Sequence, residues 1–378
     1  MKQVLTTLEE LMPEGIEFLQ QMVDMESPTF EKPLVDTLAR FVAGRFEAIG
    51  GQVSFTPVQG FGDHLRVEFS GEGDRPVMLL GHTDTVFPAG EVAKRPFGID
   101  RNIARGPGVF DMKAGIAMMW MAIRSIVTIK GHLSSPVTVL LTSDEEVGGA
   151  SSQKLIEEEA RKAQAVLVLE PSLPGGTLKT ARKGVGRFTL KTIGKATHAG
   201  INPGDGINSI EEIAHQVLRL QSMNAPERGT TVTVGVIKGG TRSNVVPAES
   251  AIEIDARITS MDEAERIATE IRSLSPVLSG SQLEVRGAIN RPPMERTKHT
   301  AALFELARRV ADELGHPLEE GSTGGASDGN FTAALGIPTL DGLGPIGLGP
   351  HQVDEHIRID SLPWRTALIA GLIERIGV

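Results

Sequence analysis

Residues 76–84 read PVMLLGHTD, a short apolar run that ends in a histidine and an aspartate. A continuous apolar run of this length is typical of a strand that is buried on both faces of a parallel sheet. Alternate residues of a strand point to the same side, so His82 and Asp84 should leave the carboxyl end of the strand together. Open α/β sheets bind their ligands at that edge. A buried histidine beside a turn aspartate is the alternative interpretation.

Two further apolar runs, at 137–141 and 165–169, are each followed by carboxylates. Glu145 and Glu146 follow the first run, and Glu170 follows the second. Adjacent carboxylates repel each other at an apolar sheet edge unless they share a cation or a proton, although a solvated loop would also tolerate them. Helical patterns separate the runs, so the sequence predicts an α/β domain with a mainly parallel sheet covered by helices.

The pattern changes after residue 183. Half-exposed strands are predicted at 186–193, 231–237, 251–258 and 282–288, with helices at 207–221 and 262–274 between them. This order of strands and helices is that of a ferredoxin-like α+β sandwich. We therefore expect residues 184–297 to form a domain inserted into a first domain, which consists of residues 1–183 and 298–378.

Composition excludes several classes of partner and site. The net charge is −10 and the basic residues are dispersed, so we expect no nucleic-acid partner. The first residues are acidic and amphipathic, and no run approaches the ~20 apolar residues of a membrane span, which predicts a cytoplasmic protein without membrane association. There is no cysteine, so any metal must be held by His, Asp or Glu. Aromatic residues make up only 4%, so a pocket built on stacked rings would be hard to furnish.

Two later motifs complete a metal-ligand set. Asp111 lies at a loop-to-helix junction in GPGVFDMKAG, residues 106–115, where a helix N-cap is the ordinary interpretation. His351 lies in GPHQVDEH, residues 349–356, and His356 competes with it. Two histidines and three carboxylates are what two metal ions need if one carboxylate bridges them.

The ordered motifs resemble the signature of the dizinc amidohydrolase family that includes bacterial glutamate carboxypeptidase, aminoacylase, acetylornithine deacetylase and succinyl-diaminopimelate desuccinylase. The motifs span nearly the whole chain, and HTDTVFP and GPGVFDMK look closest to the glutamate carboxypeptidase branch. Thr197 and Ala114 depart from the residues that the family often has, Ser and Gly, but remove no ligand. The motifs are HTD at 82–84, DMK at 111–113, DEE at 144–146, EP at 170–171, THAG at 197–200 and His351.

The resemblance implies a zinc-peptidase-like catalytic domain with two zinc ions per subunit, for which cobalt or manganese could substitute. Asp111 would bridge the ions. His82 and Glu170 would complete one metal site, and Glu146 and His351 the other.

The resemblance also implies roles around the metals. Glu145 would be the general base and Asp84 the partner of His82, and the peptide bond that joins residues 111 and 112 would be cis. The inserted domain would serve as a dimerisation and lid domain whose His198 completes the site of the partner subunit in a homodimer. A surface histidine in a turn is the alternative for His198.

Substrate recognition is predicted from the same domain and from one loop. The resemblance implies that Asn244 reaches the reacting centre and that Arg257 binds the substrate's carboxylate, for which a guanidinium fork is suited. An exposed strand arginine is the alternative for Arg257. Arg291 is a second candidate, and the loop that contains Gly325 offers backbone donors for an anion.

These expectations predict a hydrolase of an amide or peptide bond next to a free carboxylate. A metal-activated water would attack, and Glu145 would move its proton to the leaving nitrogen. The expected activity is that of a glutamate-carboxypeptidase-like exopeptidase acting on a small peptide or N-acyl amino acid. The alternative is an N-acyl-amino-acid deacylase of the acetylornithine deacetylase or desuccinylase type. A zinc-dependent binding protein without turnover would be expected to lose Glu145, and a nucleotide-binding enzyme would need a glycine-rich phosphate loop that is missing.

Overall fold

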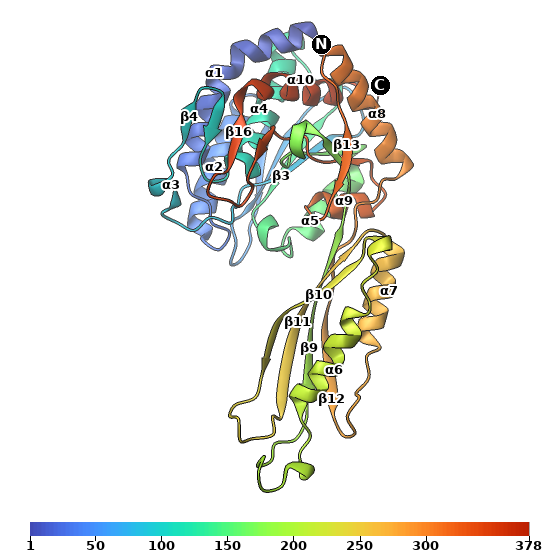
Figure 1. The fold of residues 1–378 in the computed structure, drawn as a ribbon. Coiled ribbons are helices and arrows are strands. Elements are labelled where there is room, and N and C mark those ends of the chain that lie inside the picture. Colours follow the sequence, from blue (N-terminus) through green and yellow to red (C-terminus); the bar gives the residue numbers. More distant parts are fainter. Residues whose placement is uncertain (378) are drawn as a thin grey trace. The chain divides into compact units, whose positions relative to one another are not determined.

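The computed structural model describes residues 1–377 and divides into two compact units (Figure 1). Unit 1 comprises Met1–Ala181, Arg296–Ser322 and Ser327–Val378, and unit 2 comprises Arg182–Glu295 and Thr323–Ala326. The breaks lie two residues from the boundaries expected at 183/184 and 297/298. Thr323–Ala326 belong to unit 2, although the sequence predicted that residues 298–378 belong to the first domain.

The main sheet of unit 1 has six strands in the order β1-β2-β6-β3-β7-β14. The pairs β6–β3, β3–β7 and β7–β14 are parallel, and the pairs β1–β2 and β2–β6 are antiparallel. The sheet is therefore mainly parallel, as predicted, with an antiparallel edge. Its strands are β1 (Gln52–Thr56), β2 (His64–Phe69), β3 (Val77–His82), β6 (Val137–Thr142), β7 (Ala165–Val168) and β14 (Thr339–Leu340).

Helices cover both faces of this sheet (Figure 1). Val77 and Leu79 of β3 belong to a large apolar core, whereas Met78 and Leu80 belong to a smaller one, as the alternation of side chains along a strand requires. The large core is closed by α1 (Lys2–Asp24), α2 (Lys32–Glu47), α4 (Ala114–Lys130), α8 (Lys298–Glu313) and α10 (Leu362–Ile373). The smaller core is closed by α5 (Gln153–Lys162) and α9 (Gly329–Ala334).

Short elements complete unit 1. A second sheet has the order β15-β16-β5-β4, and β13 pairs with β8. None of these short strands was predicted. Their bounds are β4 (Gly98–Asp100), β5 (Ile103–Arg105), β8 (Leu178–Arg182), β13 (Glu320–Thr323), β15 (Gly347–Leu348) and β16 (His356–Arg358), and the short helix α3 spans Glu91–Lys94.

One stretch of the described residues, Val109–Lys130, is long and apolar enough to cross a membrane by length and composition. It contains α4, and 78% of its most apolar window is buried inside the structure. Helix α4 packs against α1 and α10, which is the position of a core helix.

Unit 2 is an antiparallel sheet covered on one face by two helices (Figure 1). The elements follow the order β9, α6, β10, β11, α7, β12, and the strands lie in the order β10-β11-β9-β12. This is the predicted ferredoxin-like arrangement. The bounds are β9 (Gly184–Ile193), α6 (Ser209–Gln221), β10 (Thr231–Gly239), β11 (Glu249–Ile258), α7 (Met261–Arg272) and β12 (Gln282–Arg291).

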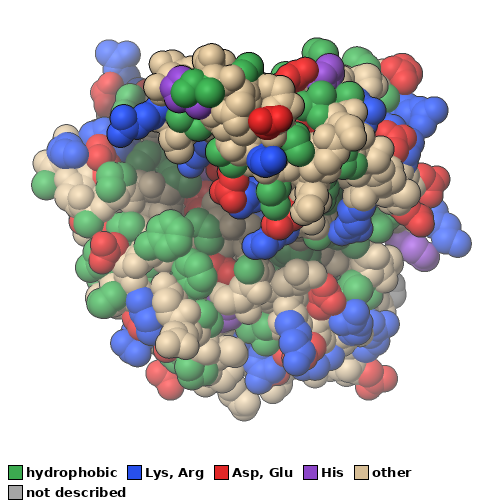
Figure 2. All heavy atoms as spheres, turned by 90° about the horizontal axis from the view of Figure 1, so that it is seen from below, with side chains coloured by type: hydrophobic (Ala, Val, Ile, Leu, Met, Phe, Trp, Pro, Cys, Tyr) green, Lys and Arg blue, Asp and Glu red, His purple; other side chains and the backbone are tan. Residues whose placement is uncertain are grey.

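Charge is mixed on one face of the molecule. Figure 2 shows basic and acidic side chains intermingled on the face drawn there, with no large area of one sign. A strongly basic surface is what would attract a phosphate backbone. The face shown does not have that character.

Candidate metal centre

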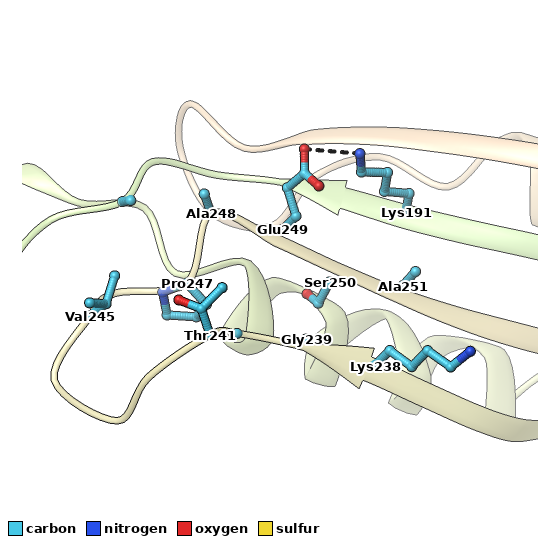
Figure 3. Close-up of a pocket in the computed structure, with 12 residues that line it drawn as sticks. Lys191, Lys238, Gly239, Thr241, Val245, Pro247, Ala248, Glu249, Ser250 and Ala251 are labelled. Carbon is cyan, nitrogen blue, oxygen red and sulfur yellow. Dashed lines mark ion pairs between the residues drawn. The ribbon is translucent and has the colours of Figure 1, made fainter.

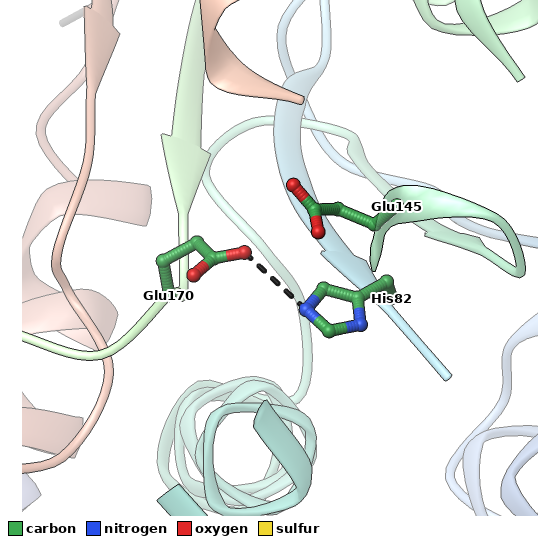
Figure 4. Close-up of side chains that lie close together, drawn as sticks. All are labelled: His82, Glu145 and Glu170. Atoms are coloured by element: carbon green, nitrogen blue, oxygen red, sulfur yellow. Dashed lines mark ion pairs between the residues drawn. The ribbon is translucent and has the colours of Figure 1, made fainter. Parts of the chain in front are cut away.

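Four of the predicted site residues follow three neighbouring parallel strands. His82 is the last residue of β3, Glu145 and Glu146 come shortly after β6, and Glu170 comes shortly after β7. Because β6, β3 and β7 are adjacent and parallel, their carboxyl ends lie at one edge of the sheet. Figure 4 shows the side chains of His82, Glu145 and Glu170 gathered at this edge.

The second sheet brings Asp111 and His351 together. Strand β16 pairs with β5, so the loop between β15 and β16, which holds His351, lies beside the segment that leads from β5 to α4 and holds Asp111. The peptide bond between Asp111 and Met112 is cis, as the resemblance implies. At Gly115 a Cβ atom would lie 2.3 Å from the carbonyl oxygen of Leu169, so only glycine lets the start of α4 reach the end of β7.

The carboxylate of Asp111 joins the two halves of the cluster. Its Oδ1 lies 3.2 Å from Nε2 of His82, and its Oδ2 lies 3.2 Å from Nε2 of His351. Nε2 of His82 is also 3.3 Å from Oε1 of Glu170, and Nε2 of His351 is 3.1 Å from Oε2 of Glu146. Two His–Glu pairs therefore flank one shared carboxylate, which is the pattern expected for two metal ions with one bridging ligand.

The pKa values of the clustered side chains are shifted by burial and by their neighbours. Burial raises the pKa of Glu146 to about 8 and also raises the pKa of Glu170. Burial acts in the same direction on Asp111, but the hydrogen bonds of His351 and His82 hold the pKa of Asp111 well below its usual range. Asp111 and Glu146 raise the pKa of His351 to about 11. Burial alone would lower the pKa of His82, but the surrounding carboxylates raise it well above its ordinary value. Buried carboxylates that face one another in this way favour a cation among them.

The donor set fits a pair of divalent metal ions. Oε1 of Glu146 is buried and has no hydrogen-bond partner among the described residues. A buried, unsatisfied carboxylate oxygen among further carboxylates is costly unless a cation is bound. Nitrogen and oxygen ligands suit zinc, cobalt or manganese. Two groups of three side chains could each hold a metal ion, because within each group the potential ligand atoms lie within 4.8 Å of one another. The groups are His82, Glu145 and Glu170, and His82, Asp111 and Glu146.

The structure distinguishes the two candidate histidines of the last motif. His351 contacts the cluster from a backbone with φ of 64°, in the left-handed region. His351 Nε2 faces the carboxylates of Asp111 and Glu146, whereas the Nδ1 of His356 lies 2.8 Å from the backbone oxygen of Asp354. The geometry therefore favours His351 as the ligand.

Asp84 has a wider set of contacts than the predicted partnership with His82. Nδ1 of His82 lies 2.9 Å from the backbone oxygen of Asp84 but 3.5 Å from its Oδ1. The Asp84 carboxylate accepts hydrogen bonds from the backbone N–H groups of Glu145 and Glu146, each at 3.3 Å, and from the hydroxyl of Thr29 at 2.8 Å. This buried carboxylate thus positions the segment that carries the candidate base.

Glu355 is a positioning residue that sequence reasoning missed. Its carboxylate accepts hydrogen bonds from the backbone N–H groups of Gly108, Phe110 and Asp111 at 3.0, 2.7 and 2.9 Å. The side chain is buried, and burial raises its pKa to about 7. The loop that presents Asp111 is therefore held by a carboxylate four residues after His351. The only signal in the sequence was an acidic residue close to that histidine.

Replacing Glu355 with alanine should weaken metal binding about 10- to 100-fold, the usual cost of removing a group that orients a ligand. Three backbone donors would lose their acceptor, and Asp111 would lose its fixed orientation. Glu355→Gln should lose less, because the amide keeps one oxygen acceptor. Zinc affinity, measured by competition with a chromophoric chelator, is the readout. Asp354→Ala, at the exposed neighbouring position, is the control, and equal loss in both variants would contradict the role.

Two further predicted residues lie side by side in unit 2. His198 forms an isolated β-bridge with Val245, and the backbone N–H of Ala199 donates to the backbone oxygen of Asn244 at 3.0 Å. Both His198 and Asn244 are exposed. The fold thus brings together two residues that are distant in sequence, and their roles remain predictions.

Arg257 and the loop that contains Gly325 also meet in unit 2. Nε of Arg257 donates to Oδ1 of Asp255 at 2.7 Å and Nη2 donates to its Oδ2 at 3.1 Å, while Nη1 donates to the backbone oxygen of Gly324 at 3.3 Å. Asp255 therefore holds the guanidinium that is predicted to bind a carboxylate. Arg291, the second candidate, is buried.

Unit 2 also contains a pocket of about 490 Å³ beside the 239–248 loop (Figure 3). Its charged lining residues are Lys191, Lys238 and Glu249, of which Lys191 and Glu249 form an ion pair at 3.0 Å. No candidate metal-ligand group among the described residues lies there. Pocket size alone therefore does not locate the chemistry.

The fold and the cluster define the class of this protein as a metal-dependent hydrolase that acts on peptide or amide bonds. Residues 78–375 match Peptidase family M20/M25/M40, and the chain belongs to this family. A dinuclear metal site is a feature of its metallopeptidases. The predicted resemblance is confirmed.

Relatives and solved structures agree with this assignment. The chain is 29% identical over 372 residues to carboxypeptidase G2 of Pseudomonas sp. (strain RS-16), covering 97% of this chain and 90% of the relative. It is 31% identical over 345 residues to succinyl-diaminopimelate desuccinylase of Xanthomonas euvesicatoria pv. vesicatoria (strain 85-10), covering 84% and 90%. In fold it is similar to aminopeptidase PepT of Bacillus cereus ATCC 10987, with a TM-score of 0.78, 22% identity and coverage of 97% and 99%.

Proposed function

We propose that the protein is a zinc-dependent exopeptidase of the glutamate carboxypeptidase type, which cleaves an amide or peptide bond next to a free carboxylate. One observation carries the proposal. The two oxygens of Asp111 face two different histidines, each paired with its own glutamate, at the carboxyl edge of a parallel sheet. His82 and Glu170 would hold one ion and Glu146 and His351 the other.

The residues around the metals supply positioning and proton transfer. Bound zinc would polarise the scissile carbonyl and make hydroxide available at neutral pH. Glu145 accepts the proton of the attacking water and passes it to the leaving nitrogen. Asp84 fixes the backbone of Glu145 and Glu146, and Glu355 fixes the loop of Asp111, so the groups need little rearrangement during reaction.

Arg257 is proposed to bind the free carboxylate of the substrate. Asp255 already holds Nε and Nη2, which orients the guanidinium plane. Nη1 donates to the Gly324 backbone oxygen, and this bond is the one that a substrate carboxylate would replace. The Gly325 N–H, in the same loop, donates to Oγ1 of Thr323 at 3.4 Å, a long bond that a substrate anion would also replace.

The assembly proposed is a homodimer formed through unit 2. Strand β10 is at an edge of the sheet, and it exposes Val236 and Ile237. Leu218, on helix α6 next to this strand, is 70% exposed. An exposed apolar edge strand is a template for pairing with another chain. In such a dimer, His198 would stabilise the oxyanion in the partner's site.

Substrate hydrolysis with and without chelator tests the function. We expect the zinc-loaded chain to cleave N-acyl-L-glutamates or dipeptides that end in glutamate, to lose activity in EDTA and to regain it with added zinc. Replacing the free carboxylate of the substrate by an amide should abolish cleavage. Turnover that survives complete metal removal would contradict the proposal.

Deacylation of N-acyl amino acids is the second candidate function. It is supported by the similarity to succinyl-diaminopimelate desuccinylases at 29–31% identity. Including N-acetylornithine and N-succinyl-diaminopimelate in the same panel distinguishes the two functions. Preference for either of these substrates would favour the deacylase.

A further inference from the structure

An apolar pocket adjoins one half of the candidate metal centre within unit 1. Its volume is about 410 Å³, and its walls come from residues 28–31, 85–89 and 146–147. Most of the lining side chains are apolar, including Phe30, Val86 and Phe87. Glu146, a candidate ligand, is part of the wall. A substrate whose scissile bond lies at the metals can therefore reach into this pocket.

Two phenylalanines, Phe30 and Phe87, line this pocket although aromatic residues are scarce in the chain. The rings of Phe30 and Phe61 lie 5.8 Å apart, and the guanidinium of Arg95 lies 4.8 Å from the centre of the Phe87 ring. The two phenylalanines that line the pocket do not make it a pocket built on stacked rings, so the expectation that such a pocket would be hard to furnish is not contradicted.

Two of the apolar side chains are exposed at the pocket. Phe30 is 72% exposed and Val86 is 42% exposed. Large apolar side chains left in water beside a candidate site are typical of ligand-binding surfaces, because a ligand recovers the free energy of removing them from water. An apolar group in the pocket would cover both.

The walls are tied to the metal centre by hydrogen bonds. The backbone N–H of Thr29 donates to the backbone oxygen of Thr85 at 3.3 Å, and the N–H of Thr85 donates to the backbone oxygen of Ser27 at 2.8 Å. The Thr29 hydroxyl donates to Asp84, whose carboxylate also holds the backbone of Glu146. The pocket is thus a fixed extension of the site.

The charged residues that line the pocket are Glu31 and Glu146, and no lysine or arginine lines it. Glu146 is a candidate metal ligand whose charge a bound metal would neutralise, so Glu31 is the lining carboxylate that gives the pocket negative charge. Arg95 stacks on Phe87 and pairs with Glu91 at 2.8 Å. A carboxylate close to Glu31 would meet like charge, whereas an uncharged ring would not. This favours an uncharged acyl group in the pocket and the free carboxylate of the substrate outside it.

We propose that this pocket is the acyl-group subsite and that it selects uncharged, apolar, ring-sized acyl groups against dicarboxylic ones such as succinyl. Phe30, Val86 and Phe87 provide the apolar contact, and Glu31 rejects negative charge. The inference rests on the proposed function, since it takes the substrate to be an N-acyl amino acid cleaved at the metal centre. Within that function it argues against a desuccinylase.

The test compares N-benzoyl-, N-acetyl- and N-succinyl-L-glutamate with the zinc-loaded full chain. We expect kcat/KM for the benzoyl substrate to exceed that for the succinyl substrate by about tenfold or more, the effect of about one buried apolar group or one unfavourable charge. Phe30→Ala should lower kcat/KM for the benzoyl substrate by about tenfold and leave the acetyl substrate within about twofold. Glu31→Gln should raise kcat/KM for the succinyl substrate alone.

Controls separate this inference from the proposed function. Phe30 is exposed, so Phe30→Ala should fold normally. Ile99 is an exposed apolar side chain on β4, and Ile99→Ala should leave kcat/KM unchanged for every substrate. A preference for succinyl, or an equal loss for all acyl groups in Phe30→Ala, overturns the subsite and leaves the function standing. If no substrate is cleaved, the function fails. Calorimetric binding of N-benzoyl-L-glutamate to Glu145→Gln and to Glu145→Gln/Phe30→Ala then decides the subsite, since equal affinity overturns it.

Discussion

Glu145→Gln should lower kcat by about 10²-fold or more while both metal ions stay bound, because general-base catalysis contributes on this scale. Glutamine keeps the size of the side chain and cannot take a proton from water. Its backbone N–H would still donate to Asp84, so the 145–146 segment should keep its place. Steady-state kinetics and metal content by mass spectrometry are the two measurements.

The neighbouring residue provides a matched control for this variant. Glu146→Gln changes the same group one position away, but it removes a carboxylate that faces His351 at 3.1 Å. It should therefore lower metal content as well as kcat. Glu145 lies in one of the two potential ligand groups, so loss of metal in Glu145→Gln would recast it as a ligand. A near-normal rate would assign the base to another residue.

Mixing two inactive chains should restore activity if His198 acts across a dimer interface. His198→Ala removes the proposed oxyanion donor, and Glu145→Gln removes the base. In a mixed dimer both defects can fall on one site, which leaves the other site with its own Glu145 and an intact His198 from the partner. A random equal mixture should recover about a quarter of wild-type activity, since half the dimers are mixed and each has one good site of two.

The mixing experiment needs proof that subunits exchange. Differently tagged chains that co-purify after mixing would supply it, and a mixture of His198→Ala with itself is the negative control. Exchange without recovered activity would show that His198 does not serve the partner. A second mixture would pair His198→Ala chains with Arg257→Ala chains. Recovered activity in that mixture would show that Arg257 serves the site of its own chain.

Most of the main sheet of unit 1 and the sandwich of unit 2 could be predicted because most of their strands are long and regular in pattern. The apolar run 137–141 lies within β6 (Val137–Thr142), and the expected strand 251–258 lies within β11 (Glu249–Ile258). Strands β15 and β16 have two and three residues and leave no periodic pattern. Yet β16 brings His351 to Asp111, so the sequence indicated the ligand but not the way it is positioned.

His82, Glu146 and Glu170 could be read from the sequence because each stands at or just after an apolar run, whereas Asp111 and His351 were recognised by their motifs. The contacts of Glu355 could not, since its partners are three backbone N–H groups and backbone donors have no sequence signature. The acyl pocket was missed for a related reason. Phe30 and Phe87 are far apart in sequence and line the same pocket because a hydrogen bond between Thr29 and Thr85 joins their segments.

The order of the elements along the chain has a consequence for synthesis on the ribosome. Unit 1 is discontinuous, and α10, which packs on α1 and α4, follows unit 2 in the chain and is made after it. Unit 2 has a core of its own and lies earlier in the chain. Because chains are made from the amino end and domains fold as units, unit 2 can fold while α4 still lacks its cover. His351 emerges late as well, so a truncated nascent chain would hold His82, Asp111 and Glu170 without the histidine of the second metal.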